Sequence, residues 1–203
     1  MRLTLHMLLS LDGVMQGPGG PGEDRDGDFG HGGWSVPHDD QDMGETVSGW
    51  FAGAGAFLLG RKTYEIWSSF WPEVDPGHSV GNKLNTLPKY VASTTLKQLA
   101  WANSSLLGDD VPAAVAKLKE QPGDELQVHA SGGLAQTLIE HDLVDEYRLL
   151  LYPVHLGTGK KLFRESTKAG GLRLISTKTT ASGIIVASYE PTGPARYGSY
   201  RDD

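Results

Sequence analysis

The chain has 203 residues, a formal net charge of −7 and a sequence pI near 5.4, and this acidic balance gives it no general attraction to nucleic acid or to an anionic membrane. It contains no cysteine, which excludes disulfides, thiol chemistry and cysteine-ligated zinc. Its histidines show no HxxxH or HExxH spacing, so no metal site is expected. Because no apolar segment approaches the ~20 residues needed to span a bilayer, we expect a soluble cytoplasmic protein.

In chain order, the apolar patterns alternate between strands and helices. Apolar residues at 3, 5, 7, 9 and 11 show the alternation of a strand rather than the apolar core of a signal peptide. The expected strands lie near 2–11, 55–59, 89–93, 104–107, 125–129, 145–154, 172–180 and 183–190, and the expected helices near 38–52, 61–68, 111–120 and 132–141. This order predicts an α/β domain with a mostly parallel sheet, closed by an antiparallel hairpin at the end of the chain.

Two segments lack such a pattern. Residues 16–33 are rich in glycine, proline and aspartate and predict a solvated loop, with a lid over a ligand site as its possible role. The loop contains a GxGxxG match at Gly17, Gly19 and Gly22, which we reject because prolines interrupt it and the acidic residues that follow would repel pyrophosphate. The composition of residues 191–203 predicts a flexible tail. We therefore expect a single domain over residues 1–190.

Two strand-to-helix corners have the composition of an anion site. One reads Gly60-Arg61-Lys62-Thr63 and the other Ser131-Gly132-Gly133. Glycine allows a ligand to approach the backbone, and the unpaired N–H groups of a helix start attract negative charge. Two cations at a helix start oppose its dipole, and a bound anion would offset that conflict. The pair of corners predicts one elongated anionic ligand, such as a phosphorylated dinucleotide; the alternative is two tight turns and a solvated helix start.

Five segments, taken together, resemble those of a known superfamily. They are SLDGVMQ (10–16), GGWSVPHDD (32–40), LLGRKTYE (58–65), LPKYVAS (87–93) and SGGLAQTLIEHDLVDEYRL (131–149). Over residues 1–190 the chain is similar to the dihydrofolate reductase superfamily, and in particular to the reductase domain of the bifunctional riboflavin-biosynthesis deaminase-reductases and their stand-alone relatives. The resemblance implies a three-layer α/β/α domain with a mixed central sheet, NADPH as the hydride donor, a small-molecule substrate and a homodimer. We expect no deaminase half in this sequence, because the zinc motif of that half needs cysteines.

The resemblance also implies which residues contact the cofactor. Arg61 and Lys62 would pair with the 2′-phosphate, and the Thr63 hydroxyl would contact the pyrophosphate. The full set of implied contacts is Gly60, Arg61, Lys62 and Thr63 at the first corner, Ser93 and Thr94 at the adenosine, Ser131, Gly132, Gly133, Leu134 and Ala135 at the pyrophosphate, and Ser10, Val14, Met15 and Gln16 at the nicotinamide. For Ser93 and Thr94, a turn or a helix cap is the alternative.

One further spacing concerns the substrate. The segment from Trp34 to Asp39 matches W-x-x-P-x-[DE] of folate reductases, whose carboxylate holds the pterin ring. This makes Asp39 the candidate catalytic residue and Trp34 a candidate substrate contact. The alternative for Asp39 is a place in the first turn of a helix, where the dipole favours acids. Asp12 and Glu146 are further substrate-binding candidates, with a turn at Asp12 and solvent exposure of Glu146 as alternatives.

Together, these features favour an NADPH-dependent reductase that transfers a hydride to a small heterocyclic or carbonyl substrate. The leading substrate is of the riboflavin-pathway 5-amino-6-(5-phosphoribosylamino)uracil type, followed by a pterin or dihydrofolate. An alternative of another class is a non-catalytic NADP-binding sensor or interaction module, because the sequence offers no unmistakable proton donor.

Overall fold

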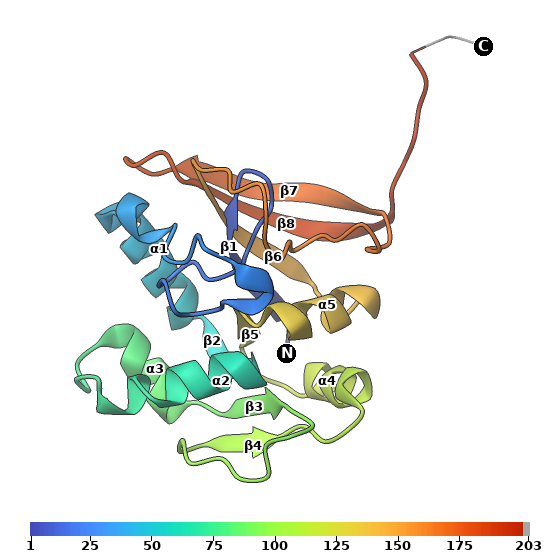
Figure 1. Cartoon of the computed structure of the whole chain (residues 1–203). Coiled ribbons are helices and arrows are strands. Elements are labelled where there is room, and N and C mark those ends of the chain that lie inside the picture. The colour runs from blue at the N-terminus through green and yellow to red at the C-terminus, as the bar shows by residue number, and fades with distance from the viewer. Residues whose placement is uncertain (201–203) are drawn as a thin grey trace.

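The computed structural model describes residues 1–200 and contains a mixed eight-stranded sheet in the order β4-β3-β2-β5-β1-β6-β8-β7 (Figure 1). The strands are β1 (Leu3–Ser10), β2 (Ala54–Gly60), β3 (Lys89–Ala92), β4 (Ser104–Leu106), β5 (Glu125–His129), β6 (Glu146–Tyr152), β7 (Gly170–Thr179) and β8 (Ile185–Pro194). The first six strands pair in parallel, whereas β6, β8 and β7 pair antiparallel. The predicted sheet and its closing hairpin are confirmed.

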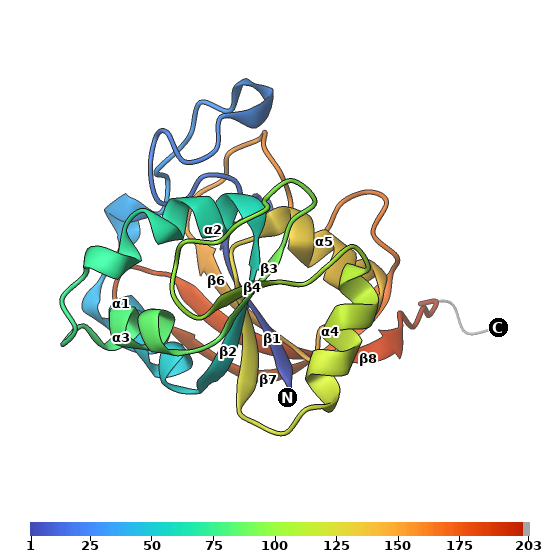
Figure 2. The ribbon, with the colours of Figure 1, turned by 90° about the horizontal axis from the view of Figure 1, so that it is seen from below.

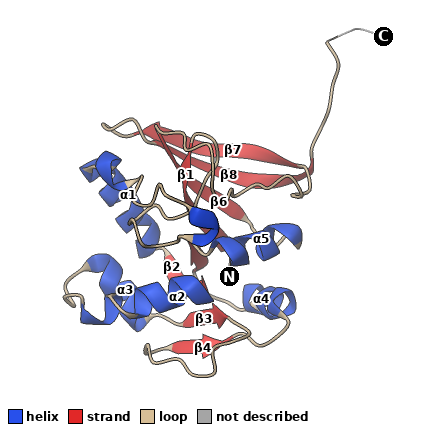
Figure 3. Ribbon diagram, in the orientation of Figure 1, coloured by secondary structure: helices blue, strands red, loops and turns tan. Residues whose placement is uncertain are grey.

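The helices cover both faces of this sheet. They are α1 (Gln41–Ala52), α2 (Arg61–Ser68), α3 (Ser79–Thr86), α4 (Val111–Glu120) and α5 (Gly132–Glu140), with one-turn 3-10 helices η1 (Asp26–Asp28), η2 (Val36–His38) and η3 (Trp71–Glu73). Figure 3 shows α1 and α3 on one side of the sheet and α4 and α5 on the other.

The alternation of side chains along the strands explains why helices pack on both faces of the sheet. Leu3 and Leu5 of β1 share a buried cluster with Leu138 of α5. The alternate residues, Thr4 and His6, point to the opposite face, where the His6 ring contacts the ring of Trp50 in α1. Each face of the central strands is therefore buried under helices, which is why these segments are apolar almost throughout.

Helix α3 was not expected from the sequence. It contains Gly81, a poor helix former. Leu84 is nevertheless fully buried in a cluster with Phe57 of β2, and the His78 side chain accepts a hydrogen bond from the Gly81 N–H at 3.2 Å. Tertiary packing and a side-chain cap thus override the low propensity of this segment.

Two element boundaries differ from expectation. The expected helix 38–52 begins at Gln41, because Asp40 caps it by accepting a hydrogen bond from the Met43 N–H at 2.8 Å. Strand β8 runs to Pro194, so residues 191–194 belong to the sheet rather than to the predicted tail, and residues 201–203 of that tail lie outside the described residues. Within residues 1–200, no helix is long and apolar enough to cross a bilayer.

Candidate functional site

A cavity of about 310 Å³ lies at the carboxyl ends of β1, β2 and β5, where ligands of open α/β sheets bind. Figure 2 shows the 16–33 loop and the segment that follows β6 beside one another at this end of the molecule. Of the predicted cofactor contacts, the following line the cavity: Met15, Gln16, Gly60, Arg61, Lys62, Thr63, Ser131, Gly132, Gly133 and Leu134. The structure therefore brings both predicted corners into one site.

The two corners are hydrogen-bonded to each other. The Gly60 N–H donates to Ser131 Oγ at 3.0 Å, and the Ser131 N–H donates to Thr63 Oγ1 at 3.1 Å. Ser131 has a φ of 55°, in the left-handed region that is costly for a residue with a side chain. These two hydrogen bonds hold Ser131 in place, and with it the direction in which α5 starts.

The first turn of α5 supplies backbone N–H groups from Gly132, Gly133 and Leu134. A Cβ on Gly132 would lie 2.6 Å from the terminal methyl of Met15, whereas a Cβ on Gly133 would meet no atom within 4 Å. Gly132 therefore serves packing, and Gly133 leaves open space beside the cavity. The Ala135 N–H, which was predicted to contact the pyrophosphate, donates to the Ser131 carbonyl at 2.9 Å inside the helix.

The two predicted cations of the first corner are held differently. Arg61 pairs with Glu65, one turn along α2, at 2.7 Å, and both side chains are exposed. Lys62 instead extends to the 16–33 loop, where its Nζ lies 2.5 Å from Asp26 Oδ2. Hydrogen bonds from Lys160 and Lys62 lower the pKa of Asp26 to about 2, so this carboxylate is ionised at neutral pH.

Lys160 is a cation of the cavity that the sequence analysis did not single out. Its Nζ lies 2.6 Å from Asp24 Oδ2 and 2.7 Å from Asp26 Oδ2. The preceding Gly159 has a φ of 117°, and a Cβ there would lie 2.7 Å from the Val14 side chain, so only glycine fits this turn. The signal that could have revealed Lys160 is its place after a glycine-containing turn that follows an apolar strand.

The 16–33 loop is held by the side chain of Gln16. Its Nε2 donates to the carbonyls of Asp24 at 3.3 Å and Asp26 at 2.9 Å, and its Oε1 accepts from the Lys160 N–H at 3.0 Å. The Trp34 indole N–H donates to the Gln16 carbonyl at 2.8 Å. The side-chain amide of Gln16 is therefore engaged in ordering the loop as one wall of the cavity, and the contact of this segment with a nicotinamide stays a prediction.

Ser10, Asp12 and Val14 lie outside the cavity lining and form one turn. Asp12 Oδ1 accepts from the Ser10 hydroxyl at 2.7 Å, and its two oxygens also accept from the N–H groups of Leu156 and Gly157. These hydrogen bonds, that of Ser10 foremost, lower the pKa of Asp12 to about 2. The Val14 N–H donates to Ser10 Oγ at 2.9 Å. The structure gives Asp12 the turn role that was its alternative, and the nicotinamide contacts of Ser10 and Val14 stay predictions.

Ser93 and Thr94 follow β3 and also lie outside the cavity lining. Ser93 Oγ accepts from the N–H groups of Thr95 at 3.2 Å and Leu96 at 3.0 Å. Thr94 is exposed. Ser93 thus stabilises a turn, as the alternative interpretation proposed, and the expected adenosine contact of the two residues stays a prediction.

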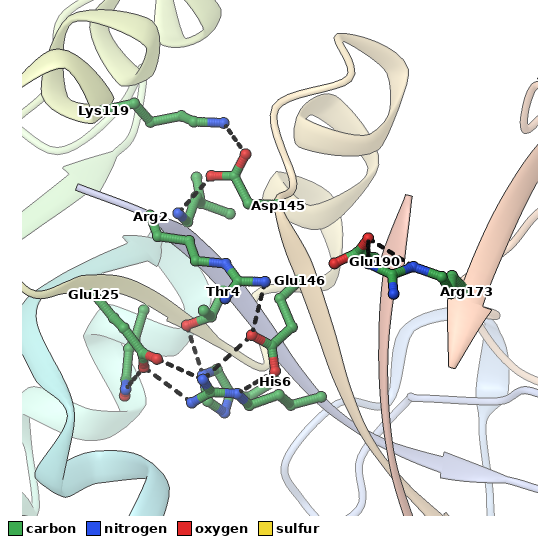
Figure 4. A network of polar contacts seen from close by, with 12 residues as sticks. Arg2, Thr4, His6, Lys119, Glu125, Asp145, Glu146, Arg173 and Glu190 are labelled. Atoms are coloured by element: carbon green, nitrogen blue, oxygen red, sulfur yellow. Dashed lines mark hydrogen bonds and ion pairs between the residues drawn. The ribbon is translucent and has the colours of Figure 1, made fainter. Parts of the chain in front are cut away.

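Glu146 lies at the opposite end of the sheet from the cavity. It is the first residue of β6 and pairs in register with Thr4 near the start of β1. Its buried carboxylate forms ion pairs with Arg148 at 2.8 Å and Arg2 at 3.2 Å, and Arg148 also binds Glu125 (Figure 4). This carboxylate balances the charge of the part-buried Arg148 away from the cavity, and its contact with a substrate stays a prediction.

Asp39 and Trp34 lie close to Tyr152 and do not line the cavity. The Tyr152 hydroxyl donates to Asp39 Oδ1 at 3.3 Å, and the Trp34 ring packs edge-on against Tyr152 with its centroid 5.4 Å away. Burial raises the pKa of Asp39, although the hydrogen bond from Tyr152 opposes the shift. Asp39 precedes α1 and does not lie in its first turn, which was its alternative place. The acidic residue of that turn is Asp42, and Asp40 is the N-cap.

Known proteins resemble this chain in sequence and in fold. The family model of the RibD C-terminal domain matches residues 2–186. YyaP of Bacillus subtilis, an uncharacterized protein, is 29% identical over 195 residues, which are 95% of this chain and 96% of YyaP. A structure of a protein from Shewanella sp. PV-4, provisionally named for riboflavin biosynthesis, has a TM-score of 0.71 and 20% identity, covering 95% of this chain and 99% of that one. A pyrimidine reductase-like protein from Corynebacterium diphtheriae has a TM-score of 0.65 and 13% identity, covering 94% and 91%.

Proposed function

Because the chain belongs to the RibD C-terminal domain family and is a reductase of that family, we propose that it uses NADPH to reduce a small heterocyclic substrate. The leading substrate is of the 5-amino-6-(5-phosphoribosylamino)uracil type. The observation that carries the proposal is the pair of corners joined by the Thr63–Ser131 and Ser131–Gly60 hydrogen bonds around one cavity.

The residues around the cavity fit a phosphorylated dinucleotide. The first-turn amides of α5 would hold the pyrophosphate, and Gly133 leaves the space that a close approach requires. Arg61 and Lys62, which line the same cavity, would hold the 2′-phosphate. When bound, NADPH supplies the hydride for a C=N or C=O carbon.

Residues of the chain itself would exclude water from the site and would bind or supply a proton. The 16–33 loop forms a wall of the cavity through Gln16, and such a lid limits access of solvent. Asp39 would hold the substrate or a proton, since burial raises its pKa towards the range suited to acid–base catalysis. Tyr152 would orient that carboxylate through its hydrogen bond.

Titration with NADPH and NADH tests the cofactor. Two charge-assisted contacts of about 1.5–3 kcal/mol each would favour NADPH by tenfold or more. Arg61→Ala should weaken binding of NADPH far more than of NADH, whereas Arg173→Ala, on the distant strand β7, should change neither. Equal dissociation constants of the wild-type protein for the two cofactors would contradict the proposal.

Oxidation of NADPH across a substrate panel tests the reaction. The panel contains pyrimidine ribityl precursors, pterins and aldehydes, and we expect turnover with the first group. Turnover with a pterin alone would favour the folate-type alternative. NADPH binding without turnover on any member would favour the non-catalytic sensor.

A further inference from the structure

Two lysines and two aspartates form a compact cluster at the mouth of the cavity. Lys62 Nζ lies 2.5 Å from Asp26 Oδ2 and 3.6 Å from Asp24 Oδ1. Lys160 Nζ lies 2.6 Å from Asp24 Oδ2 and 2.7 Å from Asp26 Oδ2. Each ammonium group therefore contacts both carboxylates, although the lysines and the aspartates come from three separate segments of the chain.

We propose that Lys62 and Lys160 form one phosphate site, and that Asp24 and Asp26 act as internal substitutes for the phosphate, so that a phosphorylated ligand displaces the acidic tip of the 16–33 loop, residues 24–26, when it binds. The identity of the ligand, a dinucleotide phosphate, rests on the proposed function. The site itself requires only phosphate chemistry.

The charges around the cavity support this exchange. Its lining includes the four cations Arg61, Lys62, Lys160 and Arg164 and the three carboxylates Glu23, Asp24 and Asp26. A phosphate beside Lys62 and Lys160 would be repelled by Asp24 and Asp26, whereas it would replace them well as a hydrogen-bond acceptor for both ammonium groups. The phosphate would thus replace the two carboxylates at the lysines, and its repulsion of Asp24 and Asp26 would push this part of the loop outward.

The way in which the loop is held makes displacement feasible. The side chains of Lys62 and Asp26 are exposed by 51% and 56%, and ion pairs of such exposure contribute little each. By contrast, the base of the loop is fixed by the buried Trp34 N–H, which donates to the Gln16 carbonyl. Displacement of the acidic tip would also break the hydrogen bonds from Gln16 Nε2 to the Asp24 and Asp26 carbonyls and the less exposed Lys160–Asp24 pair, while the Trp34 hydrogen bond keeps the base of the loop in place.

The proposal also gives the acidic loop a role in selecting the ligand. A ligand without a phosphate at this position cannot compensate Lys62 and Lys160 for the loss of Asp24 and Asp26. A ligand therefore needs a phosphate to compete with the loop carboxylates for the two lysines. This role differs from that of Arg61, which pairs within its own helix.

Calorimetric titration with NADPH and with inorganic pyrophosphate tests the site. Asp24→Asn/Asp26→Asn should bind both probes at least about fivefold more tightly than the wild type, because the competing charges are gone. Asp26→Asn alone, at an exposed position, should show part of the gain if the double variant folds poorly. The matched control is Asp28→Asn, in the same loop, outside the cavity lining and at a φ of 58°, which asparagine tolerates.

Limited trypsin cleavage tests the movement of the loop. Arg25 lies between the two aspartates, so pyrophosphate should speed cleavage after Arg25 in the wild-type protein. Unchanged or slower cleavage in saturating pyrophosphate would overturn the displacement. If Asp24→Asn/Asp26→Asn bound pyrophosphate no more tightly than Asp28→Asn, the competition would be overturned. Improved binding of pyrophosphate with no binding of NADPH in any variant would contradict the proposed cofactor and leave the phosphate site standing.

Discussion

The Tyr152 hydroxyl at the end of β6 donates a hydrogen bond to Asp39 Oδ1 at 3.3 Å, across 113 residues of sequence. Burial raises the pKa of Tyr152, and the neighbouring Asp39 raises it further, so the hydroxyl keeps its proton and acts as the donor. Tyr152 thus holds the candidate catalytic carboxylate from strand β6. Strand β1, which pairs with β6, ends at the cavity.

Asp39→Asn should lower turnover of the true substrate by ~10²–10⁴-fold, the range for loss of a general acid or base. Binding of NADPH should barely change, because Asp39 does not line the cavity with the two corners. Steady-state kinetics and cofactor titration measure both effects, with Asp109→Asn at an exposed loop position as the control. Turnover within about twofold of the wild type would remove Asp39 from the mechanism.

Tyr152→Phe should move the pH dependence of the rate. The Tyr152 hydrogen bond lowers the pKa of Asp39, whereas burial raises it. Removal of the hydroxyl leaves the burial effect unopposed, so the pKa of Asp39 should rise and the limb of the pH–rate profile that reports it should shift to higher pH. The same limb should vanish in Asp39→Asn. A profile of Tyr152→Phe that overlays the wild type would show that the rate does not report Asp39.

Gly133→Val should weaken NADPH binding by about tenfold or more without unfolding the protein. A Cβ at Gly133 meets no atom within 4 Å, so the side chain starts in open space and takes up room beside the first-turn amides of α5. The control is Gly44→Val in α1, where a Cβ also meets no atom within 4 Å. It makes the same change in helix propensity as Gly133→Val. Titration and far-ultraviolet circular dichroism check both variants, and normal binding by Gly133→Val would move the pyrophosphate away from α5.

Stability should fall between pH 7.5 and 5.5 because of two buried histidines. His6 and His129 stack at 4.2 Å between their centroids, and burial, with the charge of Arg148 adding to it, lowers the pKa of His129 to about 3 and that of His6 well below 6.5. Below pH 6.5 the unfolded chain takes up protons that the folded state refuses, so the free energy of unfolding rises with pH. Over this interval each histidine should contribute about 1.4 kcal/mol.

Urea unfolding at the two pH values measures this loss. His6→Phe should reduce the loss by about half, whatever its effect on absolute stability, and His155→Phe at an exposed position is the control. Carboxylates with ordinary pKa values stay ionised over the interval, so they add little. A His6→Phe variant with the pH dependence of the wild type would show that folding does not lower the pKa of His6.

The homodimer implied by the family resemblance stays a prediction, and β7 offers the surface to test it. This edge strand exposes Leu172, Leu174 and Ile175 by 41–48%, and exposed apolar edges favour association. Leu174→Lys should shift the protein towards a monomer in sedimentation velocity, whereas Lys178→Leu on the same strand should not. A wild-type protein that sediments as a monomer at tens of micromolar would contradict the prediction.

Much of the fold and part of the site could be predicted from the sequence, because they depend on local patterns. Apolar alternation located the strands, and the compositions of Gly60–Thr63 and Ser131–Gly133 located both corners of the cavity. These signals are local because strand exposure and helix starts depend on neighbouring residues. By contrast, helix α3 lacks a local signal, since the burial of Leu84 that stabilises it exists only in the folded protein.

The tertiary structure alone decided which side chains meet. The contacts of Lys62 with Asp26, Lys160 with Asp24 and Tyr152 with Asp39 join residues 36, 136 and 113 positions apart. Such distances along the chain carry no periodicity, so nothing in the sequence pairs these groups. The order β2-β5-β1-β6 brings the carboxyl ends of distant strands together, and it results from burying both faces of the sheet at once. The sequence thus determined the chemistry of the corners, and packing determined which charges surround them.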